Sequence, residues 1–358
     1  MMNHMEKTDM IGLPRPSSTT RRRFLLTLGA AGASAAVGSA FWHFARSGKV
    51  ARLPTGLQAA KRTGFALGAD VSILALHENQ AAAEKAIDAA FAELATVESV
   101  MSLYRPESQI CRLNEKRELL EPHPYLVQVL RQAQAMSATS GGAFDITVQP
   151  LWTLYANSAD AGRTPGAEDI DRIRKYVDWR KVEVSDERIQ LIGPGTAITL
   201  NGIAQGFAAD RVLAALAENG VRHALVNTGE IGSMGRRGDG DSWTVGIQHP
   251  RQKDAMIRRV HLEGRCIATS GDYETTFTPD YANNHIFDPH TGRSPQAFQS
   301  VTVAAQTGLE ADALSTTVFV AGVDRGVKLI ESTPGADGFF VLRDGQIRAT
   351  AGFPGGVS

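Results

Sequence analysis

The polar pair Asp312 and Thr316 is the strongest candidate for chemistry in this sequence. Residues 300–305 form a β-branched run that predicts a strand, and residues 308–320 follow with apolar side chains at helical spacing. Positions four apart lie one above the other on a helix, so we expect the carboxylate and the hydroxyl to converge near its amino end. Two hard oxygens at the positive end of a helix suit Mg²⁺ and the phosphates that it carries. The alternative is that Asp312 is a first-turn carboxylate that favours the helix dipole and Thr316 is a core-facing hydroxyl.

A second group of candidate residues lies in loops and at the ends of predicted elements. His285 lies in an extended segment, and histidine is the side chain best suited to move protons near neutral pH; a hydrogen-bonded structural role is the alternative. Tyr104 would stack on a planar ring or close the core at a helix end. Phe144 and Asp145 follow paired glycines, which either let a ligand approach the main chain or cap a helix.

The segment 201–211 begins Asn-Gly-Ile-Ala-Gln-Gly and leads from a predicted strand into a predicted helix. A glycine-containing turn before a helix can cradle phosphate in principle. The glycine spacing is not G-x-G-x-x-G and there is no P-loop lysine. Neither standard nucleotide-binding fold is therefore supported.

Alternation and helical spacing predict strands interleaved with helices. We expect strands at residues 64–76, 182–184, 189–191, 197–200, 224–227, 243–248, 338–342 and 346–349. We expect helices at residues 80–100, 124–140 and 169–177, and from the 201–211 segment through Asn219. Ser108 is a plausible cap for a short turn after the first helix.

Composition bounds the class of protein. The chain has 358 residues, 43% apolar and 21% charged, which is ordinary for one large or two ordinary globular domains. A net charge of -1 gives no electrostatic footprint for nucleic acid, so we expect no nucleic-acid partner. Cys111 and Cys266 are the only cysteines and form no disulfide framework. We expect buried thiols, although an oxidising compartment would permit one bridge.

Residues 1–47 form a separate N-terminal region. Arg21, Arg22 and Arg23 precede Phe-Leu and a weakly apolar, Ala/Gly-rich run, a pattern typical of a twin-arginine export signal. A membrane-anchoring helix is the alternative, but glycines and serines make the run only mildly hydrophobic. We therefore expect a periplasmic protein exported in the folded state. Cleavage of the signal is left open, and an uncleaved signal would anchor the protein in the membrane.

Six motifs occur in order within residues 64–349. They are Ser102-Leu103-Tyr104 with Ser108 and Asn114, Gly142-Ala143-Phe144-Asp145, Gly202-Ile203-Ala204-Gln205-Gly206-Phe207-Ala208, Ala268-Thr269-Ser270-Gly271-Asp272-Tyr273, His285-Ile286-Phe287-Asp288-Pro289-x-Thr291-Gly292 and Ala311-Asp312-x-x-x-Thr316. Together they resemble the motifs of the ApbE family, the FAD:protein FMN transferases. The resemblance implies an α+β fold of mixed sheets with packed helices, in which residues 48–358 form the transferase domain.

The same resemblance implies a metal site and a flavin site. Mg²⁺ would be bound by the side chains of Asp312 and Thr316 and by the carbonyl of Gly202. The FAD site would be lined by Tyr104, Ala143, Phe144 and Asp145, with Gln205 and His285 facing the dinucleotide. His285 would be the general base for a Thr or Ser hydroxyl of a target flavoprotein, which attacks the FMN-side phosphorus of FAD while AMP departs.

Three positions depart from the family pattern. Thr199, counted with the cofactor site, replaces an acid before the glycine turn, and Glu230 occupies a usual glycine position. Gln205 replaces a common lysine, and because glutamine cannot neutralise charge, weaker FAD binding or slower transfer is expected. The segments 201–206 and 228–230 resemble the subgroup linked to nitrous oxide respiration, whose acceptor would be a membrane-bound flavoprotein. A metal-dependent FAD pyrophosphatase and a non-catalytic flavin-binding assembly factor are the alternative functions.

Overall fold

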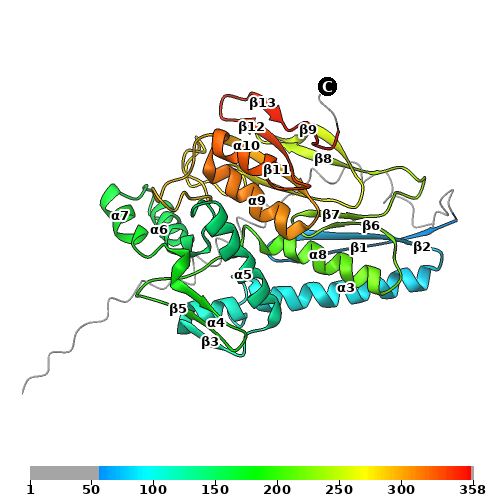
Figure 1. The fold of residues 1–358 in the computed structure, drawn as a ribbon, viewed down its shortest axis with the longest axis horizontal. Coiled ribbons are helices and arrows are strands. Elements are labelled where there is room, and N and C mark those ends of the chain that lie inside the picture. The colour runs from blue at the N-terminus through cyan, green and yellow to red at the C-terminus, as the bar shows by residue number, and fades with distance from the viewer. Residues whose placement is uncertain (1–55, 356–358) are drawn as a thin grey trace, which may run out of the picture.

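The computed structural model describes residues 56–355, so the signal predicted in residues 1–47 lies outside the described part of the chain. The centre of the fold is an antiparallel sheet of eight strands in the order β1-β2-β6-β7-β10-β11-β12-β13 (Figure 1). The strands are β1 (Gln58–Ala66), β2 (Ala69–His77), β6 (His223–Asn227), β7 (Ile231–Met234), β10 (Cys266–Gly271), β11 (Phe298–Ala305), β12 (Asp337–Leu342) and β13 (Ile347–Ala349).

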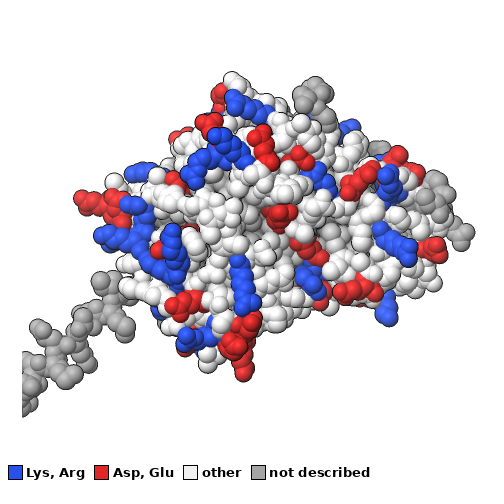
Figure 2. All heavy atoms as spheres, in the orientation of Figure 1, with Lys and Arg blue, Asp and Glu red and all other residues white. Residues whose placement is uncertain are grey.

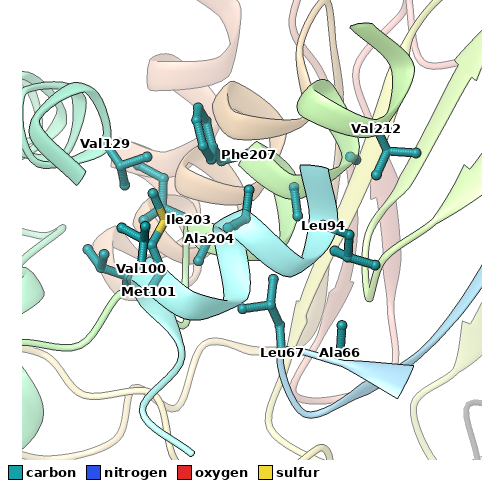
Figure 3. Close-up of a cluster of buried hydrophobic side chains, with 14 of the residues drawn as sticks. Ala66, Leu67, Leu94, Val100, Met101, Val129, Ile203, Ala204, Phe207 and Val212 are labelled. Carbon is teal, nitrogen blue, oxygen red and sulfur yellow. The ribbon is translucent and has the colours of Figure 1, made fainter. Parts of the chain in front are cut away.

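Three helices cover one face of this sheet: α3 (Gln80–Met101), α8 (Ala204–Glu218) and α9 (Gly308–Ala321). α3 packs on β1, β2 and α8, and α8 in turn packs on α9. Figure 3 shows part of the buried core between α3 and α8, where Leu94 and Met101 lie in the same cluster as Phe207 and Val212. This packing fixes the amino ends of α8 and α9, which carry several predicted site residues.

The β8–β9 hairpin covers the opposite face of the sheet. It consists of β8 (Trp243–His249) and β9 (Gln252–Leu262). Its Trp243 and Leu262 pack against Leu225 and Phe339 of the large sheet, whereas the adjacent Val226 and Phe340 face the helices. Because both faces are covered, strands such as β11 are buried along almost their whole length.

A lateral lobe of helices and short strands completes the fold (Figure 1). It contains α4 (Gln109–Lys116), α5 (Pro124–Thr139), η2 (Ile146–Val148), α6 (Gln149–Asp160), α7 (Ala167–Arg174), η3 (Trp179–Lys181) and the small sheet β3 (Glu118–Leu120), β5 (Arg188–Leu191) and β4 (Val182–Val184). The remaining helix, α10 (Val323–Glu331), packs on α9. The predicted α+β class with packed helices is confirmed, and the strand pairs of the described sheets are all antiparallel.

Two strand predictions are wrong. The segment 64–76 is the tip and second strand of the β1–β2 hairpin, because the chain reverses at Leu67 and Gly68, with φ of 52° and 80°. Residues 197–200 form no strand. Two loop contacts hold them instead: Ile198 exchanges hydrogen bonds with the Asn114 side chain, and the Thr199 N–H donates to the Ile146 carbonyl at 2.8 Å.

The predicted helix caps are informative. Ser108 is the N-cap of α4, since its hydroxyl accepts a hydrogen bond from the Cys111 N–H. Gly141 and Gly142 follow α5 with φ of 64° and 83°, and their N–H groups donate to Ala138 and Ser137. The C-cap explanation for the paired glycines is therefore confirmed.

The charged surface and the two cysteines do not narrow the functional class of the protein further. Basic and acidic side chains are interspersed on the face shown in Figure 2. Within residues 56–355, no helix has the length and apolar character needed to cross a bilayer. The same residues contain no disulfide: the Cys111 thiol donates to the Ser102 and Leu103 carbonyls, and the Cys266 Sγ lies 3.8 Å from Asp210 Oδ1.

Candidate active site

One cavity of about 500 Å³ gathers the residues that the sequence motifs single out. It borders the first turn of α8, the side of α9 that carries Asp312, Thr316 and Val320, and the β8–β9 hairpin. Every predicted site residue contributes to its lining: Tyr104, Ala143, Phe144, Asp145, Thr199, Gly202, Gln205, His285, Asp312 and Thr316. The fold thus brings together side chains from distant parts of the sequence, as a binding cavity requires.

Two glycines let α8 and α9 touch at their amino ends. A Cβ on Gly206 would lie 2.0 Å from the Gly308 carbonyl oxygen, and a Cβ on Gly308 would lie 2.4 Å from the Gly206 carbonyl oxygen. Because the obstructing atoms are backbone, no larger residue fits at either position. The turn before α8 also lies close to α9, since a Cβ on Gly202 would lie 2.8 Å from Thr316 Oγ1.

Asp312 lies at this crossing with one carboxylate oxygen in use. Its Oδ2 accepts a hydrogen bond of 2.9 Å from the Gly206 N–H, and its Oδ1 accepts none from the residues that the structure describes. Burial raises the pKa of Asp312 to about 7, and the nearby Asp210 carboxylate acts in the same direction. A buried carboxylate that is costly to ionise is well suited to a cation that would neutralise it.

The neighbouring oxygens complete a set that fits a hard cation. Thr316 Oγ1 lies 3.0 Å from Ser270 Oγ, on the side of α9 that faces β10. Residues 56–355 contain no group of three or more His, Cys, Asp or Glu side chains that could hold a metal. The candidate set at Gly202, Asp312 and Thr316 instead combines one carboxylate with a hydroxyl and a main-chain carbonyl. Oxygen ligands of this kind, with water and substrate phosphate, are typical of Mg²⁺.

The first N–H groups of α9 are not available to an anion. The N–H groups of Gly308 and Leu309 donate to Asp210 at 2.6 and 2.9 Å, and the Glu310 N–H donates to the Thr307 hydroxyl. These donors are therefore satisfied within the protein. Asp312 lies in the second turn of α9 and accepts a hydrogen bond from the Gly206 N–H of α8. It is therefore not the first-turn carboxylate that the alternative predicted.

The amino end of α8 keeps a donor for an anion. The N–H of Gly206 is taken by Asp312, whereas the N–H of Gln205 has no acceptor among residues 56–355. Gln205 lines the cavity. The glycine turn at 201–206 is consequently the better candidate for phosphate contact, as its sequence suggested.

His285 presents a nitrogen suited to accept a proton. Its Nδ1 lies 3.2 Å from the Thr275 carbonyl oxygen, which can only accept, so Nδ1 carries the proton in this hydrogen bond. The lone pair of the neutral ring is then on Nε2. Burial lowers the pKa of His285, which keeps the ring neutral to lower pH.

The predicted flavin-side residues form another part of the wall. Tyr104 is 39% exposed and its ring lies against Gly68, whereas Ala143 and Phe144 are buried. The Asp145 carboxylate accepts from the Thr147 N–H at 2.7 Å and the Trp179 N–H at 3.0 Å. Burial raises the pKa of Asp145 despite these bonds. Its carboxylate therefore holds two loops together at the cavity edge.

Two of the three departures from the family pattern, Thr199 and Gln205, also line the cavity. Thr199 Oγ1 accepts a hydrogen bond of 3.2 Å from the Asn201 N–H, which stabilises the turn before α8. Gln205 Nε2 donates to the Leu67 carbonyl at 3.4 Å, and its side-chain amide packs on Gly229, whose φ is 101°. A lysine at position 205 would place a cation where this amide lies.

Sequence reasoning gave no role to two residues that the structure places in the site. Glu230 lines the cavity, and its Oε2 accepts a hydrogen bond of 3.1 Å from the Thr269 N–H. Burial and the Asp312 carboxylate raise the pKa of Glu230 well above its ordinary value. Ser270 contacts the hydroxyls of both Ser315 and Thr316. The only sequence signal for Ser270 was its place in the motif Ala268-Thr269-Ser270-Gly271-Asp272-Tyr273.

Comparisons with known proteins agree with this geometry. Residues 67–340 match the model of the ApbE family. The FAD:protein FMN transferase of Treponema pallidum is 30% identical over 290 residues, covering 75% of this chain and 80% of that protein. The protein of the same name from Escherichia coli K12 is 29% identical over 246 residues, covering 65% and 70%.

Solved structures show the same fold. The crystal structure of the ApbE protein from Thermotoga maritima has a TM-score of 0.74 at 30% identity and covers 82% of this chain and 97% of that one. The apo form of the Pseudomonas stutzeri flavinyl transferase ApbE has a TM-score of 0.71 at 28% identity, covering 84% and 98%. The resemblance carried by the sequence motifs is thereby confirmed, and the chain belongs to the ApbE family.

Proposed function

We propose that this protein transfers FMN from FAD to a Thr or Ser hydroxyl of a target flavoprotein, with Mg²⁺ as cofactor and AMP as the leaving group. The observation that carries the proposal is the meeting of Gly202, Asp312 and Thr316 at the α8–α9 crossing, inside the cavity that also holds His285. The names of the curated relatives support flavin transfer.

The cavity residues divide into two groups around the dinucleotide. The exposed face of Tyr104 would stack on the flavin, with Ala143, Phe144 and Asp145 shaping the adjoining wall. The unpaired Gln205 N–H would donate to a phosphate oxygen, and the Gln205 side chain would contact the dinucleotide without neutralising its charge.

Transfer exchanges the phosphoanhydride bond of FAD for a phosphoester bond to the acceptor. The oxygen of the acceptor hydroxyl forms a bond to the FMN-side phosphorus, the bond from that phosphorus to the bridging oxygen breaks, and AMP leaves with that oxygen. His285 Nε2 accepts the hydroxyl proton, and the bond from Nδ1 to Thr275 holds the ring in the required tautomer. Asp312, Thr316 and the Gly202 carbonyl would hold Mg²⁺, which supplies charge stabilisation at the diphosphate when bound.

The N-terminal sequence supports a reaction outside the cytoplasm. The twin arginines in residues 1–47 support export to the periplasm, with a membrane anchor if the signal is retained. The segments 201–206 and 228–230 support the subgroup linked to nitrous oxide respiration. The acceptor would then be a membrane-bound flavoprotein.

Mass spectrometry of an acceptor peptide tests the proposal. The purified protein is incubated with FAD and Mg²⁺, with and without a flavin-accepting protein. We expect FMN on a Thr or Ser of the acceptor together with AMP, and loss of both products in Asp312→Ala. Rapid release of AMP and free FMN without acceptor would instead identify a pyrophosphatase. Tight FAD binding with no product under any metal would identify a non-catalytic flavin-binding factor.

A further inference from the structure

The α8–α9 crossing is built from the same short pattern on both helices. Gly206 is followed four residues later by Asp210, and Gly308 is followed four residues later by Asp312. The two glycines are in contact, and each aspartate accepts the N–H of the glycine on the other helix. The bond from Gly206 N to Asp312 Oδ2 is 2.9 Å and that from Gly308 N to Asp210 Oδ1 is 2.6 Å. We call this arrangement the reciprocal clamp.

The two aspartates of the clamp differ in what they have left to offer. Asp210 uses both oxygens, since its Oδ2 also accepts the Leu309 N–H at 2.9 Å. Asp312 uses only Oδ2, and Oδ1 accepts no hydrogen bond from the described residues. One aspartate is therefore committed to the backbone, and the other retains an oxygen for a ligand.

We infer that Asp210 is a positioning residue that holds Asp312 and Thr316 in register with Gly202. It binds the first two N–H groups of α9, so it fixes the helix on which both side chains lie. Gly202 precedes α8, the helix that carries Asp210 itself. The clamp thus connects α9, which carries Asp312 and Thr316, to the turn before α8, which carries Gly202. The inference rests on the proposed function, in which these three residues bind Mg²⁺.

A near-isosteric change removes one of the two hydrogen bonds that Asp210 accepts from α9. In Asp210→Asn, Oδ1 can still accept one N–H, but the amide nitrogen faces the second N–H, where it cannot accept. The charge that favours the helix amino end is lost as well. Loss of groups that orient metal ligands typically weakens metal binding 10- to 100-fold. Because Asp210 acts through the α9 backbone, we expect about a tenfold weaker affinity.

Titration with Mn²⁺, followed by electron paramagnetic resonance, measures the metal affinity of each protein without catalytic turnover. The matched control is Asp337→Asn, which removes another partly buried aspartate, the partner of Arg265 at 2.9 Å, outside the cavity. We expect Asp337→Asn to lower the melting temperature yet bind Mn²⁺ within twofold of the wild type. Asp210→Asn binding within twofold of the wild type would overturn the inference. A wild type that binds no Mn²⁺ would overturn the metal assignment and the inference with it.

Hydrogen exchange of the wild-type protein provides a test that does not depend on a variant folding. If the clamp couples the two helices, Mn²⁺ slows exchange of the Gly206 amide and of the Gly308 and Leu309 amides together. Protection of Gly206 with no change at Gly308 and Leu309 would show that Asp210 does not respond to the metal site, and would also overturn the inference.

Discussion

Replacing Asp312 by asparagine should stabilise the metal-free protein above neutral pH and abolish its response to Mg²⁺. The carboxylate is 3% exposed and close to Asp210, so its ionised form is unfavourable in the folded protein. An asparagine removes that charge, and its Oδ1 can still accept the hydrogen bond from the Gly206 N–H. Asp312 would then be a residue that serves function and lowers the stability of the metal-free protein.

The magnitude follows from the change in proton affinity. Folding raises the pKa of Asp312 from 3.8 to about 7. Between these values the folded protein binds a proton that the unfolded chain has released, so the free energy of unfolding falls as pH rises. At about 1.4 kcal/mol for each pKa unit, the loss reaches at most about 4 kcal/mol above pH 7. The protonated carboxyl carries no such penalty at low pH.

Urea denaturation of the metal-free proteins from about pH 5 to about pH 8 measures the effect. The wild type should lose stability relative to Asp312→Asn across this interval, with the difference largest at the alkaline end. Added Mg²⁺ should restore the wild type and leave the variant unchanged. Parallel pH dependence of the two proteins, or equal stabilisation of both by Mg²⁺, would refute the reasoning.

Other substitutions test separate parts of the site. His285→Gln should slow transfer at least about 100-fold and remove the acid limb of the rate profile. Because burial lowers the pKa of His285, that limb should lie at a lower pH than an ordinary histidine would give. Stopped assays of AMP release across pH measure both effects. Gly202→Ala should weaken Mn²⁺ binding at least about tenfold, because the added Cβ would lie 2.8 Å from Thr316 Oγ1. The control Gly166→Ala should leave Mn²⁺ binding unchanged, because its Cβ would have no atom closer than 3.9 Å. Gln205→Lys should tighten FAD binding in a fluorescence titration by adding a cation near the diphosphate, and unchanged affinity would place position 205 away from the phosphates.

Short-range patterns allowed much of the fold to be predicted. The helical spacing of residues 80–100 predicted α3 to within one residue, because the period of apolar side chains along a helix is a local pattern in the sequence. The hairpin at Leu67 and Gly68 was missed because Leu67 adopts a positive φ, which side-chain type alone does not signal. Residues 197–200 have the composition of a strand, but hydrogen bonds to the distant residues Asn114 and Ile146 hold them instead of a neighbouring strand.

The site shows the same division between local and long-range information. The ten predicted site residues could be named from the sequence, and the structure places all of them in the lining of one cavity. Which donors stay available could not be predicted. The partners of the α9 amino end and of Asp312 come from α8, about a hundred positions earlier, and only the packing of two glycines brings them into contact.

A crystal structure of the protein with FAD and Mn²⁺, with the metal located by anomalous scattering, tests the central claim most directly. The account predicts a metal bound to Asp312 Oδ1, Thr316 Oγ1 and the Gly202 carbonyl, at coordination distances close to the roughly 2.1 Å typical of Mg²⁺, and in contact with the FAD diphosphate. A metal bound elsewhere, or a diphosphate that does not contact it, would contradict the account.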